Sequence, residues 1–233
     1  MTFGTLGRLR TATTPGIAGG ADTITLADGD NVIIAGTGAD QVTVGNGMNT
    51  ILGDSGTVDY VVTDGSDLFV DQIVSDSALT DGNDRIIAGE GNNIGVAGNG
   101  NDTVTAGSGN NFVLGDTGNL RFGTTGNLRR ASTPGTSGGH DSITITGGNN
   151  FVIAGVGTDS VTVGNGTDMI LGDSGVIDYV ITDNNETAVD LIESGAAPGD
   201  GNDTIIAGSG AKYIIAGNGN DTITTGTGRD FVL

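Results

Sequence analysis

A nine-residue repeat is the feature of this sequence that most constrains its fold. From Ala21 to Gly56 the chain divides into four consecutive units, ADTITLADG, DNVIIAGTG, ADQVTVGNG and MNTILGDSG, each with Asp or Asn second, an aliphatic residue fourth and Gly ninth. Side chains alternate between the two faces of a strand, so the fourth residue can point inward while its neighbours point outward. Glycine permits a tight turn, because it adopts positive φ without steric cost. Each unit therefore predicts one short strand and one turn.

A second, longer period covers the whole chain. Residues 120–233 match residues 1–114 at a constant offset of 119, without insertion or deletion, so that Tyr60 matches Tyr179. We therefore expect the chain to be a window on a longer repetitive polypeptide. The predicted segments are the end of a preceding insertion hairpin (1–19), a first nonapeptide block (20–56), an acidic insertion (57–82), a second block (83–118), a basic insertion hairpin (119–138), a third block (139–175), a second acidic insertion (176–201) and a truncated fourth block (202–233).

The composition favours bound cations over nucleic acid. The 233 residues include 28 acidic and 8 basic residues, for a net charge of −20, which repels nucleic-acid phosphates and anionic membranes. The chain has no cysteine and therefore neither disulfides nor thiolate metal sites. It has no apolar run of membrane-spanning length and no signal-peptide core near residue 1, so we expect any export signal to lie outside this chain.

Two nonapeptides, eighteen residues, are needed to close one coil of a repeating fold. We predict an all-β fold, a flattened right-handed parallel β-solenoid (a β-roll) with two strands per coil, interrupted by hairpin insertions. Its coils would stack about 4.8 Å apart. Gly95 occupies a fourth position without an evident reason. The aliphatic fourth-position residues expected to fill the thin core are Ile24, Ile33, Val42, Ile51, Ile86, Val104, Val113, Ile143, Val152, Val161, Ile170 and Ile205.

The nonapeptide resembles a known repeat. The units AGTGADQVT, AGNGNDTVT, AGVGTDSVT, AGNGNDTIT and TGTGRDFVL are similar to the G-G-x-G-x-D-x-U-x pattern of the repeats-in-toxin (RTX) family. Blocks that end in L-G-D-x-G, followed by a hairpin and a fresh start, resemble the repeat regions of giant secreted and cell-surface bacterial proteins. The resemblance implies that turn carbonyls and the Asp of stacked turns coordinate Ca²⁺ between coils, as suits a cation that takes six or more oxygen ligands.

The candidate metal ligands follow from that resemblance. Two carboxylates stacked about 4.8 Å apart repel by roughly 1 kcal/mol in water and by about 3–4 kcal/mol at an effective dielectric of about 20, a penalty that bridging cations remove. The competing interpretation is a metal-free solenoid in which these residues are solvated or cap turns. The positions that match the family's Asp fall eighteen residues apart within each block and therefore on one edge: Asp22, Asp40, Asp84, Asp102, Asp141, Asp159, Asp203 and Asp221.

The opposite edge departs from the family pattern, because its second positions are mostly asparagine. Asparagine can form a ladder of amide hydrogen bonds without metal, so calcium is expected mainly on the Asp edge. For the Asp residues of the L-G-D motifs, which replace a turn glycine, a turn-forming role is favoured over metal binding. The Asn-edge residues are Asn31, Asn49, Asn93, Asn111 and Asn150, with Asp168 and Asp230 as exceptions and Lys212 as an incompatible one; the L-G-D residues are Asp54, Asp116 and Asp173.

The two predicted faces differ in polarity. Outward positions on the Asp strands are mostly Thr and Ser, whereas those on the Asn strands are apolar, as in Phe112 and Leu114. An apolar stripe of that length must be covered. Either the insertions fold back over it, or a second solenoid or partner packs there. The insertion at 119–138 predicts a hairpin turned by Gly123–Gly126, while 57–82 predicts two longer strands joined through Gly65. Acidic and basic insertions could also pair, laterally or between molecules.

These observations predict a structural role. The chain has one histidine, His140, and no motif that pairs a nucleophile with a base, so we expect no enzyme. We predict a calcium-stabilised structural or adhesive rod or fibre in a giant secreted or cell-surface bacterial protein. Its partners would be calcium, further repeats of the same polypeptide and homotypic contacts. The alternative is a passive RTX module of a secreted toxin or enzyme. Thr rows that bind ice or polysaccharide are a third, weaker interpretation.

Overall fold

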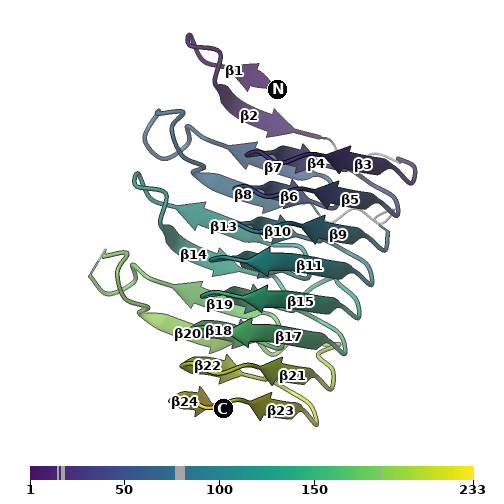
Figure 1. The fold of residues 1–233 in the computed structure, drawn as a ribbon, viewed down its shortest axis with the longest axis vertical. Coiled ribbons are helices and arrows are strands. Elements are labelled where there is room, and N and C mark those ends of the chain that lie inside the picture. The colour runs from purple at the N-terminus through teal and green to yellow at the C-terminus, as the bar shows by residue number, and fades with distance from the viewer. Residues whose placement is uncertain (15, 17–18, 77–81, 184) are drawn as a thin grey trace.

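The computed structural model describes residues 1–14, 16, 19–76, 82–183 and 185–233. Parts of the predicted insertions, residues 15, 17–18, 77–81 and 184, lie outside this description. The described chain contains 24 strands in three eight-stranded sheets, which run side by side along the long axis of the molecule (Figure 1). The two sheets built from nonapeptides are parallel, and the sheet built from the insertions is antiparallel. The predicted all-β parallel solenoid is confirmed.

The strands that follow the predicted Asp residues form one parallel sheet, here called the Asp sheet. Thr23 pairs with Gln41, eighteen residues later, and Gln41 pairs with Arg85 across the acidic insertion. The insertion therefore leaves the coil stack unbroken. The members of the Asp sheet are β3 (Thr23–Leu26), β5 (Gln41–Val44), β9 (Arg85–Ala88), β11 (Thr103–Ser108), β15 (Ser142–Gly147), β17 (Ser160–Asn165), β21 (Thr204–Ala207) and β23 (Thr222–Thr225).

The strands that follow the asparagines, with their exceptions, form the second parallel sheet, here called the Asn sheet. One strand of each parallel sheet makes one coil, as the eighteen-residue spacing predicts. The members of the Asn sheet are β4 (Val32–Ile34), β6 (Thr50–Leu52), β10 (Ile94–Val96), β12 (Phe112–Leu114), β16 (Phe151–Ile153), β18 (Asp168–Leu171), β22 (Lys212–Ile215) and β24 (Asp230–Val232).

The first core lies between the Asp sheet and the Asn sheet. Eleven of the twelve predicted core residues are buried there, and Ile24 packs against them partly buried. Burial alternates along the Asp strands, as in β15, so the hydroxylic side chains face outward. Gly95 leaves unfilled space in this core, because a Cβ placed on it would meet only Val104 Cγ1, at 4.0 Å. Nothing in the packing requires glycine there.

The insertions form the third sheet, here called the insertion sheet. The hairpin predicted at 119–138 is present, with Asn119 paired to Ser132. Successive insertions also pair with each other, since β8 pairs with β13 and β14 with β19. The members of the insertion sheet are β1 (Thr2–Phe3), β2 (Leu9–Thr13), β7 (Gly56–Asp59), β8 (Gln72–Ser75), β13 (Asn119–Phe122), β14 (Leu128–Ser132), β19 (Gly175–Asp178) and β20 (Leu191–Ser194).

The insertion sheet covers the apolar face of the Asn sheet. Leu52 and Leu114, which point outward from the Asn sheet, are buried in a second core with Ile73 and Leu120 of the insertion sheet. The hypothesis that the insertions fold back over this stripe is therefore confirmed for most of its length, whereas Tyr213 and Phe231 in the last two coils are exposed. Oppositely charged insertions also pair within the chain: Arg130 Nε lies 3.4 Å from Asp178 Oδ2. Such partly exposed pairs contribute little to stability.

The prediction that residues 57–82 form two long strands is wrong. β7 and β8 have four residues each, and the chain between them leaves the sheet. Asp59 Oδ1 accepts the N–H groups of Val61 and Val62 at 2.8 and 2.9 Å, which turns the chain away after Asp59. Side-chain bonds of this kind compete with strand pairing. The alternating hydrophobic pattern did not reveal this competition.

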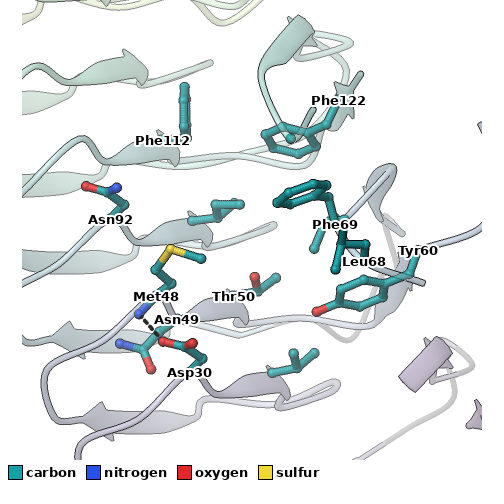
Figure 2. Close-up of a pocket in the computed structure, with 14 residues that line it drawn as sticks. Asp30, Met48, Asn49, Thr50, Tyr60, Leu68, Phe69, Asn92, Phe112 and Phe122 are labelled. Carbon is teal, nitrogen blue, oxygen red and sulfur yellow. Dashed lines mark hydrogen bonds between the residues drawn. The ribbon is translucent and has the colours of Figure 1, made fainter. Parts of the chain in front are cut away.

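A pocket of about 360 Å³ lies where this loop meets the Asn sheet. It is lined by Tyr60 and Phe69 from the loop and by Met48 and Phe112 from the Asn-sheet side (Figure 2). Asp30 and Tyr60 are the titratable residues of its described lining. The pocket is thus mainly an apolar gap left where the insertion loop covers the sheet.

Candidate metal centre

The eight predicted Asp residues form one continuous ladder along the entry edge of the Asp sheet. From Asp40 to Asp221, each carboxylate Oδ1 accepts the backbone N–H of the ladder Asp in the preceding coil, at 2.6 to 2.9 Å. The bonds cross both kinds of insertion, as between Asp40 and Asp84 and between Asp102 and Asp141. One oxygen of seven carboxylates is therefore committed to holding neighbouring coils together.

The other oxygen of several ladder residues is buried without a hydrogen bond. Oδ2 of Asp40, Asp141, Asp159 and Asp203 has no hydrogen-bond partner, and these residues are only 1 to 3 % exposed. Burying an ionised carboxylate without compensation is costly, so such an oxygen requires either a proton or a cation.

The electrostatics of the ladder point the same way. Burial, reinforced by the charges of Asp102, Asp116 and Asp159, raises the pKa of Asp141 to about 10. Burial is also the main reason why the pKa of Asp159 rises to about 8 and that of Asp203 to about 6. Without cations Asp141 and Asp159 therefore hold protons at neutral pH, where an ordinary Asp is ionised. A bound divalent cation would replace those protons.

Backbone carbonyls supply further oxygens at the block ends. A Cβ on Gly115 would collide with both Asp141 Oδ2 and the Ala154 carbonyl oxygen. The equivalent collision at Gly172 involves Asp203 Oδ2 and the carbonyl oxygen of Ala216. A carboxylate oxygen and a carbonyl oxygen thus converge on one space that only a glycine leaves open. Oxygen donors of these two kinds fit Ca²⁺.

The L-G-D residues lie among the ladder carboxylates, which the sequence did not predict. Asp116 is 1 % exposed, and its Oδ2 accepts the N–H of Val156 at 2.5 Å while its Oδ1 accepts that of Gly139 at 3.2 Å. It therefore holds the turn of the following coil as well as the chain returning from the insertion. Burial and the charges of Asp159 and Asp102 raise the pKa of Asp116 to about 9. The recurrence of L-G-D-x-G at every block end before an insertion is the sequence feature that could have revealed this role of the Asp.

Side chains alone do not assemble a metal site. Among the residues that the structure describes, no three Asp, Glu or His side chains lie close enough together to hold a metal ion. A cation on this edge would therefore take its ligands from the ladder Oδ2 atoms and from turn carbonyls such as that of Ala154. That combination is one that a hard cation with many oxygen ligands accepts.

The Asn edge is held differently. Each Asn Nδ2 donates to the Oδ1 of the next ladder residue, at 2.8 to 3.1 Å from Asn31 to Asn150, as the sequence predicted. Each Nδ2 also donates to the carbonyl oxygen two residues earlier in its own turn, as from Asn111 to Gly109 at 3.2 Å. An Asp at the same position lacks this donor. On the Asn edge a side-chain nitrogen therefore binds the turn carbonyl, whereas on the Asp edge that carbonyl is left for an external cation.

Fold and site together define a class of protein, the parallel β-solenoid whose acidic turns bind cations. The model of the RTX calcium-binding nonapeptide repeat family matches residues 18–51, 80–104, 88–119, 144–176 and 198–232, more than half of the chain. The chain belongs to this family and is a Ca²⁺-binding repeat module. Comparison with curated proteins and with solved structures gave no significant match. The described residues include no helix long and apolar enough to cross a membrane.

Proposed function

We propose that this chain is a calcium-stabilised structural rod segment, with adhesive use, of a giant secreted or cell-surface bacterial protein, and that it carries no catalytic activity of its own. The observation that carries the proposal is the continuity of all three sheets across the 119-residue period. Strands β8 and β13 join the acidic insertion to the basic one, and β14 and β19 join the basic insertion to the next acidic one. The insertions are thus part of the rod.

The repeat geometry suits extension by addition. Each 119-residue copy contributes four strands to each parallel sheet and therefore four coils. At about 4.8 Å per coil, one copy lengthens the rod by about 19 Å. Because the register is kept across every insertion, further copies can add without a hinge.

Calcium controls the folding of this rod in the proposal. The buried ladder carboxylates disfavour the folded state when neither protons nor cations neutralise them. At the low calcium concentration inside a cell the chain stays unfolded, and it folds outside as cations bind between the coils.

The experiment compares this role with that of a passive module in a toxin or enzyme. Antibodies raised against the chain are applied to the producing bacterium in calcium, and labelled filaments are sought by electron microscopy. Label along surface fibres supports the rod. Label confined to a soluble secreted protein with enzymatic or lytic activity would replace the proposal with the module. Solution scattering on chains with one, two and three copies measures the added length, and a bent or flexible joint between copies would contradict the rod geometry.

A further inference from the structure

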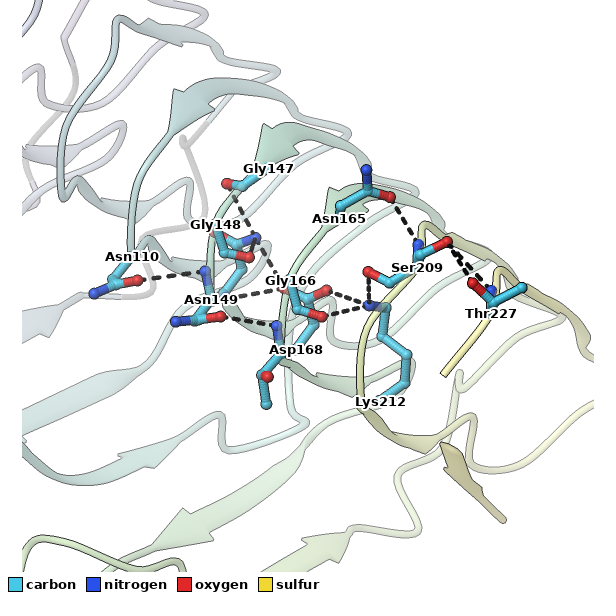
Figure 3. A network of polar contacts seen from close by, with 12 residues as sticks. Asn110, Gly147, Gly148, Asn149, Asn165, Gly166, Asp168, Ser209, Lys212 and Thr227 are labelled. Atoms are coloured by element: carbon cyan, nitrogen blue, oxygen red, sulfur yellow. Dashed lines mark hydrogen bonds and ion pairs between the residues drawn. The ribbon is translucent and has the colours of Figure 1, made fainter. Parts of the chain in front are cut away.

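The Asn edge contains one buried ion pair that its amide ladder does not explain. Asp168 replaces an asparagine at the start of β18, and its Oδ1 accepts both the backbone N–H and the Nδ2 of Asn150, each at 2.9 Å. Its Oδ2 lies 3.1 Å from Lys212 Nζ, and both side chains are fully buried. Lys212, which the sequence marked as incompatible with this edge, is therefore accommodated by a carboxylate one coil earlier (Figure 3).

The ammonium group takes the place of the amide nitrogen that Asp168 lacks. At every Asn of the edge, Nδ2 contacts the carbonyl oxygen two residues earlier, at 2.9 to 3.4 Å. At Asp168 that carbonyl belongs to Gly166, and it accepts a hydrogen bond from Lys212 Nζ at 2.6 Å. The third oxygen around Nζ is the Ser209 carbonyl, at 3.2 Å. Three oxygens thus match the three donors of an ammonium group.

We infer that the space between Asp168 Oδ2, Gly166 O and Ser209 O is a divalent-cation site in which the Lys212 ammonium replaces the metal. The set consists of one carboxylate and two backbone carbonyls, all hard oxygen donors suited to calcium. A carboxylate this deeply buried stays ionised only at a high cost unless a positive charge lies beside it, as the Lys212 ammonium does here. Removing the ammonium while leaving the oxygens in place opens the site to Ca²⁺.

The two edges therefore differ in the source of the positive charge that neutralises their buried carboxylates. At every ladder position from Asp22 to Asp221, the Asp edge has a carboxylate where the Asn edge typically has an amide, and its ladder holds no lysine. On the Asn edge a carboxylate replaces the amide at Asp168, and the Lys212 ammonium supplies the positive charge there. Calcium therefore stabilises the Asp edge, while the Asn edge up to this pair holds together without it. This inference rests on the calcium-binding character of the repeats and is independent of the rod proposal.

The test uses two variants of the whole chain. Lys212→Ala removes the ammonium and keeps all three oxygens. The double variant Asp168→Asn, Lys212→Asn restores an amide at both positions and serves as the matched control. Calcium stoichiometry is measured by isothermal titration calorimetry, and thermal unfolding is followed by circular dichroism over a series of free calcium concentrations.

We expect Lys212→Ala to bind one more Ca²⁺ per chain than the wild type and to need a higher calcium concentration to reach the wild-type melting temperature. The double variant should bind the wild-type number of ions. An unchanged stoichiometry in Lys212→Ala overturns the inference, and so does failure of Lys212→Ala to fold at any calcium concentration while the double variant folds. A double variant that does not fold contradicts the interchange of amide and ammonium. The wild type measured in parallel reports separately whether the Asp edge responds to calcium.

Discussion

Replacing Asp159 by asparagine tests the account of the Asp edge most directly. Asp159 Oδ1 accepts the N–H of Asp141 at 2.7 Å, and Oδ2 is buried without a hydrogen-bond partner. An asparagine keeps the first bond. Its Nδ2 takes the place of Oδ2 and can donate to the Gly157 carbonyl, as Asn111 donates to Gly109 on the other edge. The substitution therefore converts one coil from the acidic to the amide arrangement.

The magnitude follows from proton linkage. Burial raises the pKa of Asp159 from 3.8 to about 8. The folded pKa lies above the unfolded one, so without calcium the stability is greatest at low pH and falls as pH rises from about 4, until the loss is complete above about 8. At pH 7 the cost is set by the distance from 3.8 to 7, which corresponds to about 4 kcal/mol as an upper value. Asparagine does not carry this cost.

The assay is urea unfolding followed by circular dichroism in excess chelator, at pH 4.5 and at pH 7, with calcium stoichiometry from calorimetry. Without calcium we expect Asp159→Asn to be more stable than the wild type at pH 7 by up to about 4 kcal/mol, with a much smaller difference at pH 4.5. In calcium the variant should bind fewer ions.

The matched control places a carboxylate on the other edge. Asn111→Asp removes the donor that bonds Asn150 Oδ1 at 3.0 Å and Gly109 O at 3.2 Å. It should destabilise the calcium-free chain at pH 7, the opposite sign to Asp159→Asn. The reasoning is refuted if Asp159→Asn weakens the chelated chain at pH 7 or leaves the number of bound calcium ions unchanged.

Three further predictions concern the rest of the molecule. Apparent calcium affinity should rise between pH 5 and pH 8, because cations displace protons from ladder carboxylates with raised pKa; a pH-independent titration would contradict this. Gly95→Ala should be neutral or stabilise the calcium-bound chain by up to about 1 kcal/mol, whereas Gly100→Ala, at φ +149° and against the Gly82 carbonyl, should destabilise it by more than that, as measured by urea unfolding. Leu114→Ala should cost about 2–5 kcal/mol in thermal unfolding because it opens the second core, and exposed Phe231→Ala should cost far less; equal effects would argue against the covering sheet.

The local parts of the fold were predictable from the sequence because they depend on local chemistry. The fourth-position aliphatic residues and the turn glycines specify a strand and a turn within nine residues. The eighteen-residue spacing then places Asp22 and Asp40 on one edge and Asn31 and Asn49 on the other. The hairpin at 119–138 was also predictable from the sequence, since its two strands are adjacent in the chain.

Long-range packing decided the rest. The apolar outward face of the Asn strands indicated that another part of the protein must cover it. Only the pairing of β8 with β13 shows that consecutive insertions form this cover as one sheet. Asp116 joins the ladder because its turn packs against the following coil. Lys212 finds Asp168 because the stacking of β18 on β22 brings together residues that are 44 apart in the chain. The sequence by itself therefore determined the coil and its acidic edge, while the tertiary structure decided which buried charges the protein neutralises itself and which it leaves to calcium.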